Sequence, residues 1–60
     1  MRNVTISGRM SRTDRFILEA WLLARGISYK NNDRGGIDCK LNQDEINELR
    51  DGGHYVSVWH

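Results

Sequence analysis

The sequence predicts one α+β domain, spanning residues 1–60, whose elements follow one another in the order β-α-β-β-α-β. The chain has only 60 residues and no linker, repeat or low-complexity segment, so it holds a single small core. Four short segments alternate polar and apolar residues, which is the pattern of half-buried strands. Two further segments begin with residues that cap helices, and together these observations give the α+β class.

The first half of the chain predicts a strand and then a helix. Residues 3–7 alternate with β-branched residues favoured, and Gly8 ends this strand. Ser11, three residues before Asp14, matches a helix-capping pattern. The helix is expected over residues 12–25, because Gly26 follows and can close it with a positive φ.

The second half predicts a β-hairpin, a short helix and a last strand. Residues 27–30 and 37–41 alternate on either side of a polar, turn-rich run, which indicates the hairpin. Asn42 with Glu45 three residues on forms a capping box, and the helix should end near Arg50. Residues 55–59 supply the fourth strand.

Two β-α-β crossovers joined by a hairpin give a four-stranded antiparallel sheet with both helices on one face. This element order resembles a small ferredoxin-like fold, and the resemblance implies a fold but no function. The side chains expected between sheet and helices are Val4, Ile6, Ile27, Tyr29, Ile37, Cys39, Leu41, Val56 and Val58 from the strands, Ile17, Ala20, Trp21 and Ala24 from the first helix, and Ile46 and Leu49 from the second.

The net charge of +1 conceals an uneven distribution along the chain. Residues 1–30 carry six basic and two acidic side chains, whereas residues 31–60 carry three basic and six acidic ones. If the fold kept the halves apart, the molecule would have a basic and an acidic side, which suits a charged partner or head-to-tail pairing.

The single cysteine, Cys39, cannot form an internal disulfide, and the start of the chain does not resemble a signal sequence. The longest apolar run, residues 20–24, is far too short to span a bilayer. We therefore expect an intracellular, cytoplasmic protein without a membrane segment.

Metal binding and catalysis are both disfavoured by the residue types present. Cys39, His54 and His60 lack the paired spacing of metal ligands, and Cys39 falls on the inner face. Nucleophilic catalysis needs an oriented base in a pocket, for which so small a core has little room. We expect no enzyme activity, no metal and no cofactor.

Three arginines, Arg9, Arg12 and Arg15, crowd the start of the first helix, where the helix dipole disfavours positive charge. A bound anion would relieve this conflict, and backbone N–H groups at a helix N-terminus already suit phosphate. The alternative is that the arginines point into water, screened by Asp14 and Glu19.

Two aromatic residues, Tyr55 and Trp59, are expected on the outer face of the sheet. RNA-recognition-motif proteins stack bases on such a face, but they carry their aromatic residues on the two central strands. Here those strands have none, and Tyr55 and Trp59 belong to an edge strand. They are candidates for stacking a base or contacting a protein, or they simply cover the sheet.

The first helix is more apolar than one buried face requires, and Leu18 and Leu22 are expected near its polar side. Together with Tyr55, Trp59 and Arg15 they are the predicted partner-binding residues. The leading hypothesis is a small non-enzymatic protein-binding module, such as a phage- or virus-encoded inhibitor or adaptor covering a site on a larger host protein. A homodimer remains open, and the alternative function is nucleic-acid binding through the basic N-terminal half.

Overall fold

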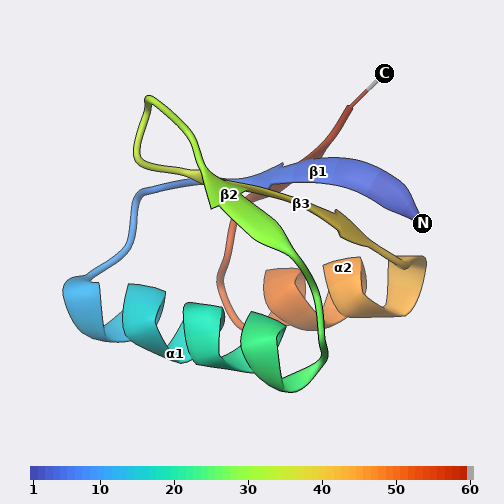
Figure 1. Cartoon of the computed structure of the whole chain (residues 1–60), viewed down its shortest axis with the longest axis horizontal. Coiled ribbons are helices and arrows are strands. Elements are labelled where there is room, and N and C mark those ends of the chain that lie inside the picture. Colours follow the sequence, from blue (N-terminus) through green and yellow to red (C-terminus); the bar gives the residue numbers. More distant parts are fainter. Residues whose placement is uncertain (60) are drawn as a thin grey trace.

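The computed structural model describes residues 1–59 and contains the six expected elements in the expected order. These are β1 (Arg2–Ile6), α1 (Arg12–Ala24), β2 (Tyr29–Asn31), β3 (Ile37–Leu41), α2 (Gln43–Asp51) and β4 (Val56–Val58). Both helices lie on the same face of the sheet (Figure 1). The α+β prediction is therefore confirmed.

The four strands form one antiparallel sheet in the order β2-β3-β1-β4. β1 pairs with β3 on one side and with β4 on the other, so it is a central strand. β2 pairs with β3 over three residues only. This is the ferredoxin-like strand order that the β-α-β-β-α-β sequence implies.

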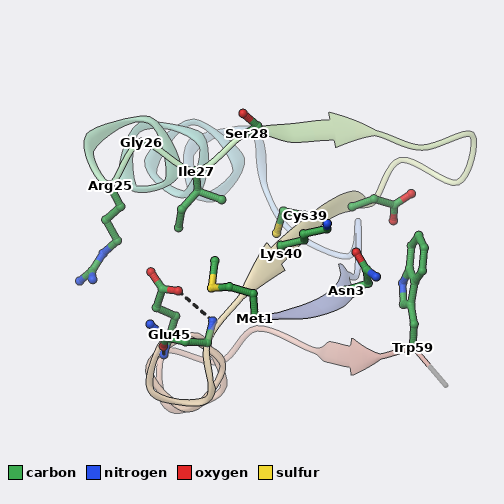
Figure 2. A pocket seen from close by; sticks show the side chains of 12 residues that line it. Met1, Asn3, Arg25, Gly26, Ile27, Ser28, Cys39, Lys40, Glu45 and Trp59 are labelled. Carbon is green, nitrogen blue, oxygen red and sulfur yellow. Dashed lines mark hydrogen bonds between the residues drawn. The ribbon is translucent and has the colours of Figure 1, made fainter.

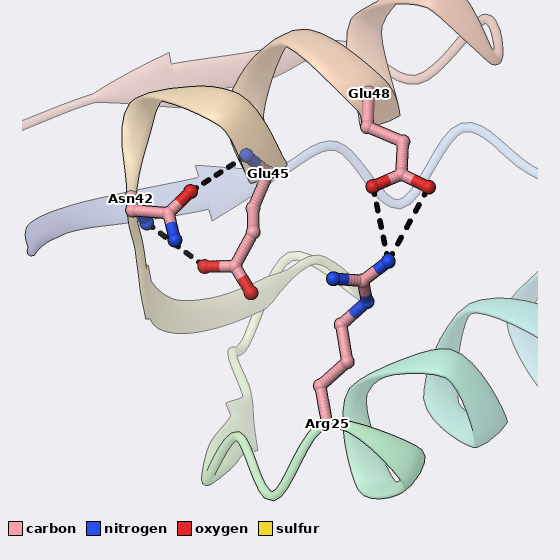
Figure 3. Close-up of polar contacts among 4 residues, drawn as sticks. All are labelled: Arg25, Asn42, Glu45 and Glu48. Atoms are coloured by element: carbon pink, nitrogen blue, oxygen red, sulfur yellow. Dashed lines mark hydrogen bonds and ion pairs between the residues drawn. The ribbon is translucent and has the colours of Figure 1, made fainter.

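Side-chain caps define the starts of both helices as expected. The Ser11 hydroxyl accepts the Asp14 N–H at 3.1 Å. At α2 the Asn42 side-chain Oδ1 accepts the Glu45 backbone N–H at 2.8 Å, and the Glu45 carboxylate accepts the Asn42 backbone N–H at 2.9 Å (Figure 3). This reciprocal capping box satisfies two backbone donors that a helix start otherwise leaves unpaired.

The core lies between the sheet and the helices. Its buried members are Val4, Ile6, Leu18, Leu22, Ile37, Cys39, Leu41, Ile46, Leu49 and Val56, with Met10, Trp21, Ile27, Tyr29 and Val58 packed against them. The strand and α2 residues expected inside are thus buried or half-buried.

The predicted orientation of α1 is wrong. Leu18 and Leu22 are the inward residues, at 2% and 0% exposed, whereas Ile17, Ala20 and Ala24 face outward. The Arg15 and Glu19 side chains are half-buried on the flank of α1 and contact β2.

The N-terminal and C-terminal halves of the chain are not kept apart by the fold. β1 lies between β3 and β4, and α1 and α2 share one face of the sheet. The charges separate by layer instead: the helices and their C-caps carry four basic and six acidic residues, and the strands and loops carry five basic and two acidic. The sheet side of the molecule is therefore the basic one.

Candidate functional site

The outward side of α1 is apolar. Phe16, Leu23 and Ile17 are 75%, 66% and 59% exposed, and the exposed Ala20 and Ala24 lie between them. Residues 16, 20 and 23 are spaced four and three apart, so they follow one stripe of the helix. We call Phe16, Ile17, Ala20, Leu23 and Ala24 the α1 face.

The polar flank of α1 fixes which side of the helix faces outward. The Arg15 guanidinium donates to the Asn31 Oδ1 at 2.7 Å and lies 3.8 Å from the Glu19 carboxylate. The Tyr29 hydroxyl donates to Glu19 at 3.1 Å. Burial raises the pKa of the Tyr29 phenol, and the hydrogen bond and charge of Glu19 raise it further. These contacts hold the helix against β2.

A second set of contacts closes the opposite flank, next to α2. The Arg25 guanidinium lies 4.4 Å from the centre of the Trp21 ring and 3.2 Å from the Glu48 carboxylate (Figure 3). A shallow hollow of about 180 Å³ runs beside it, lined by Ile17, Leu18, Trp21, Glu48, Leu49, Gly52 and His54. The α1 face therefore continues into a small apolar groove between the two helices.

Trp59 and Tyr55, the two aromatic residues expected on the outer face of the sheet, flank β4 and are 53% and 71% exposed. The Trp59 indole N–H donates to the Thr5 hydroxyl at 2.8 Å, so the side chain reaches the central strand β1. Thr5 in turn donates to Asp38 at 2.7 Å. The edge position of Trp59 was foreseen, but its reach across the sheet was not.

The three arginines of the candidate anion site have different surroundings. Arg15 is held by Asn31 and Glu19, whereas Arg12 is exposed on the first turn of α1. Arg9 is exposed beside a hollow of about 350 Å³ that Arg34 also lines. Anion binding by Arg9, Arg12 and Arg15 stays a prediction, and the neighbour that the structure gives Arg9 is Arg34.

A hollow of about 630 Å³ opens between the end of β3 and the turn after α1. In Figure 2 Arg25 stands at one end of it and Trp59 at the other. Its lining residues are Met1, Asn3, Arg25, Gly26, Ile27, Ser28, Asp38, Cys39, Lys40, Asn42, Glu45 and Trp59. Within residues 1–59, no three His, Cys, Asp or Glu side chains are grouped to hold a metal ion.

Cys39 is the one nucleophilic thiol of the chain, and its surroundings suppress its reactivity. Burial raises the pKa of this thiol to about 11, and the charges of Asp38 and Glu45 contribute. Because the thiolate is the nucleophile, the neutral thiol is a poor one at pH 7. Cys39 acts as a core side chain rather than as a reactive group.

We expect native Cys39 to react with a disulfide reagent at pH 7.4 at least about 100-fold more slowly than the urea-unfolded chain. The unfolded thiol ionises near pH 9.0 and the folded one near 11, so the unfolded state loses its proton first. The free energy of unfolding should therefore fall as the pH rises from about 9 to 11. Absorbance of the released thiolate gives the rates, and equal rates for the folded and unfolded chain would contradict this description of Cys39.

None of the helices within residues 1–59 combines the length and apolar character needed to cross a membrane. Comparison of the chain with protein-family models, with curated proteins and with solved structures gives no match.

The buried positions of Leu18 and Leu22 remove them from the predicted partner-binding residues, because neither reaches the surface. The sequence analysis expected the exposed apolar patch of α1 at Leu18 and Leu22 and missed Phe16 and Leu23. The sequence offers no clear signal for them, because every residue from Phe16 to Ala24 except Glu19 is apolar.

Proposed function

We propose that this chain is a non-enzymatic protein-binding module that covers a site on a larger protein, as an inhibitor or adaptor does, through the α1 face. The observation that supports this most strongly is the exposure of Phe16, Leu23 and Ile17 together on one helix. Large apolar patches rimmed by polar residues are typical of interaction sites. An amphipathic helix that lays such a stripe into an apolar groove is a recurrent mode of protein recognition.

The area of the α1 face favours a groove in a larger partner over a second copy of this chain. The exposed parts of its three large side chains amount to roughly 400 Å². Two copies packed helix against helix would bury about 800 Å² of this surface in total, below the about 1,200 Å² of a stable interface. A groove that encloses the helix also contacts its flanks and buries more area per chain.

The rim of the α1 face indicates the polar chemistry of that partner. Arg15 and Glu19 already pair with each other and with β2, and Arg25 pairs with Glu48. Arg12, one turn before Phe16, is exposed. We propose a partner groove with an apolar floor and a carboxylate near its end, where Arg12 would reach it.

Phe16 and Leu23 are the proposed anchors, because buried aromatic and large aliphatic side chains at the centre of an interface carry most of its binding energy. The Trp59 indole contacts Thr5 on the outer face of the sheet, away from α1, and Tyr55 directly precedes the inward-facing Val56 of the same edge strand. A single flat partner cannot contact both surfaces, so those two aromatic residues are not anchors of this interface.

The test compares quantitative capture from a lysate by the wild-type chain and by Phe16→Ser and Leu23→Ser. Each substitution should cost at least about 2 kcal/mol of binding free energy, so the affinity for the captured protein should fall about 30-fold or more. Both residues are exposed, so both variants should keep the wild-type circular dichroism spectrum. Trp59→Ala is the matched control, an aromatic truncation on the other face, and should capture the same protein.

Two results would overturn the proposal. One is capture by the folded Phe16→Ser and Leu23→Ser variants at the wild-type level. The other is a wild-type chain that sediments as a dimer while Phe16→Ser sediments as a monomer, because the occupant of the α1 face would then be a second copy.

A further inference from the structure

The side chain of Trp59 is held over the middle of the outer sheet face. In the strand register Trp59 follows Val58, which pairs with Val4, and its backbone N–H donates to the Asn3 carbonyl at 2.9 Å. Its indole N–H donates to Thr5 at 2.8 Å. Two hydrogen bonds to β1 thus fix an aromatic ring that is still 53% exposed.

A chain of hydrogen bonds continues from Trp59 across the sheet. Thr5 donates to the Asp38 Oδ1 at 2.7 Å, and the Asn32 amide donates to the same oxygen at 3.2 Å. Asp38 is the only acidic residue of the four strands. Because one of its oxygens is already bound by two donors, its charge is partly engaged within the sheet.

The exposed charges around this ring are basic. Lys30 pairs with Asp38 in the register and Lys40 pairs with Asn3, so both lysines are on the outer face with Thr5. Arg9 and Arg34 line the hollow of about 350 Å³ together with Thr5 and Ser57. Thr5 lines this hollow and Trp59 lines the larger one that contains Lys40, so the Trp59–Thr5 contact links the two.

We propose that this outer sheet face binds single-stranded nucleic acid, with a base stacked on Trp59 and phosphates held by Lys40, Arg9 and Arg34. An aromatic ring within a basic, polar surface is the combination that single strands require, since each base offers a flat face and each nucleotide a negative charge. Tyr55, four residues before Trp59 on the same side of the strand, lies about 13 Å away and offers a second platform.

A duplex fits the same surface poorly. Its bases are stacked on one another and cannot reach Trp59, and the sheet presents no helix that could enter a groove. The site lies opposite the α1 face, so a partner protein and a nucleic acid strand could be bound together. The proposal does not depend on the protein-binding function.

The test measures fluorescence anisotropy of labelled ten-nucleotide oligo-dT and oligo-U mixed with the full chain at 20, 50 and 200 mM salt. Binding should weaken as salt rises, with a log–log slope of about −2 for three phosphate contacts to a single strand. Trp59→Ala should weaken binding about 10-fold or more and leave the slope unchanged. Trp59→Phe should retain most of the affinity, and Lys40→Ala should reduce the slope by about 0.7.

Further variants and ligands make the outcome decisive. Thr5→Val removes the acceptor that orients Trp59 and should weaken binding in a chain that circular dichroism shows to be folded. Phe16→Ser, on the other side of the molecule, should bind the oligonucleotides like the wild type. Three binding results would overturn the proposal: no binding at 20 mM salt, wild-type binding by Trp59→Ala, or equal binding of a blunt duplex. It would also be overturned if Trp59→Ala lost protein capture but kept its oligonucleotide binding.

Discussion

Leu22→Ala is expected to destabilise the domain by about 2–5 kcal/mol, which is comparable to the whole stability of a domain this small. Leu22 is 0% exposed and belongs to the central cluster between α1 and the sheet. Its truncation removes the transfer free energy of the side chain and leaves a cavity that close neighbours cannot fill. A 60-residue domain has only about 3–5 kcal/mol of stability to lose.

Leu23→Ala is the matched control, because it is the same substitution one residue further along the same helix. Leu23 is 66% exposed, so its truncation should change the free energy of unfolding by no more than about 0.5 kcal/mol. Urea titrations followed by tryptophan fluorescence measure both variants. If Leu23→Ala proved the more costly, α1 would be turned the other way and the α1 face would not exist.

This pair of variants tests the orientation of α1, which the sequence does not determine. From Phe16 to Ala24 every residue except Glu19 is apolar, so hydrophobic periodicity gives no single inward direction. In α2 the only apolar residues are Ile46 and Leu49, and their direction was predicted correctly. The strands were predictable for the same reason, since alternation leaves one apolar side.

The orientation of α1 is decided by tertiary contacts. Glu19 accepts a hydrogen bond from the Tyr29 hydroxyl, and Arg15 donates one to Asn31. The charged side of the helix therefore contacts polar groups of β2. Those partners become neighbours only once the register of the sheet is known. A prediction from sequence that places every charged residue in solvent therefore rotates α1 about its axis, so that the wrong residues face the core.

The outer face of the sheet is likewise only partly predictable from the sequence. The alternation of residues 55–59 places Trp59 on the outer side of an edge strand, which is correct. Its hydrogen bond to Thr5, however, depends on the length of the side chain and on the acceptor that β1 offers. The central strands carry no aromatic residue of their own, but the Trp59 ring from the edge reaches β1, so the composition of the central strands does not exclude base stacking.

Gly8→Ala is expected to destabilise the domain by about 1–3 kcal/mol, because the loop before α1 passes directly over the β2–β3 turn. A Cβ at Gly8 would lie 2.4 Å from the Gly35 carbonyl oxygen and 2.6 Å from its carbon. Both are backbone atoms that cannot rotate away. The turn itself is fixed, since Asn32 donates its N–H to the Gly36 carbonyl at 2.9 Å and accepts the Gly35 N–H at 3.1 Å.

Gly52→Ala is the control for Gly8→Ala, and the two substitutions should change the free energy of unfolding in opposite directions. Gly52 has φ −79°, which alanine adopts freely, and a Cβ there would meet its nearest atom at an ordinary 3.5 Å. Alanine at such a position restricts the unfolded chain and should stabilise the domain by about 0.4–1 kcal/mol.

Urea titration measures both variants, and hydrogen exchange at Asn32 and Gly35 should quicken in Gly8→Ala alone. Unchanged stability of Gly8→Ala would mean that the loop and the turn are not in contact, and the hollow lined by Arg9 and Arg34 would lose the backbone that shapes it.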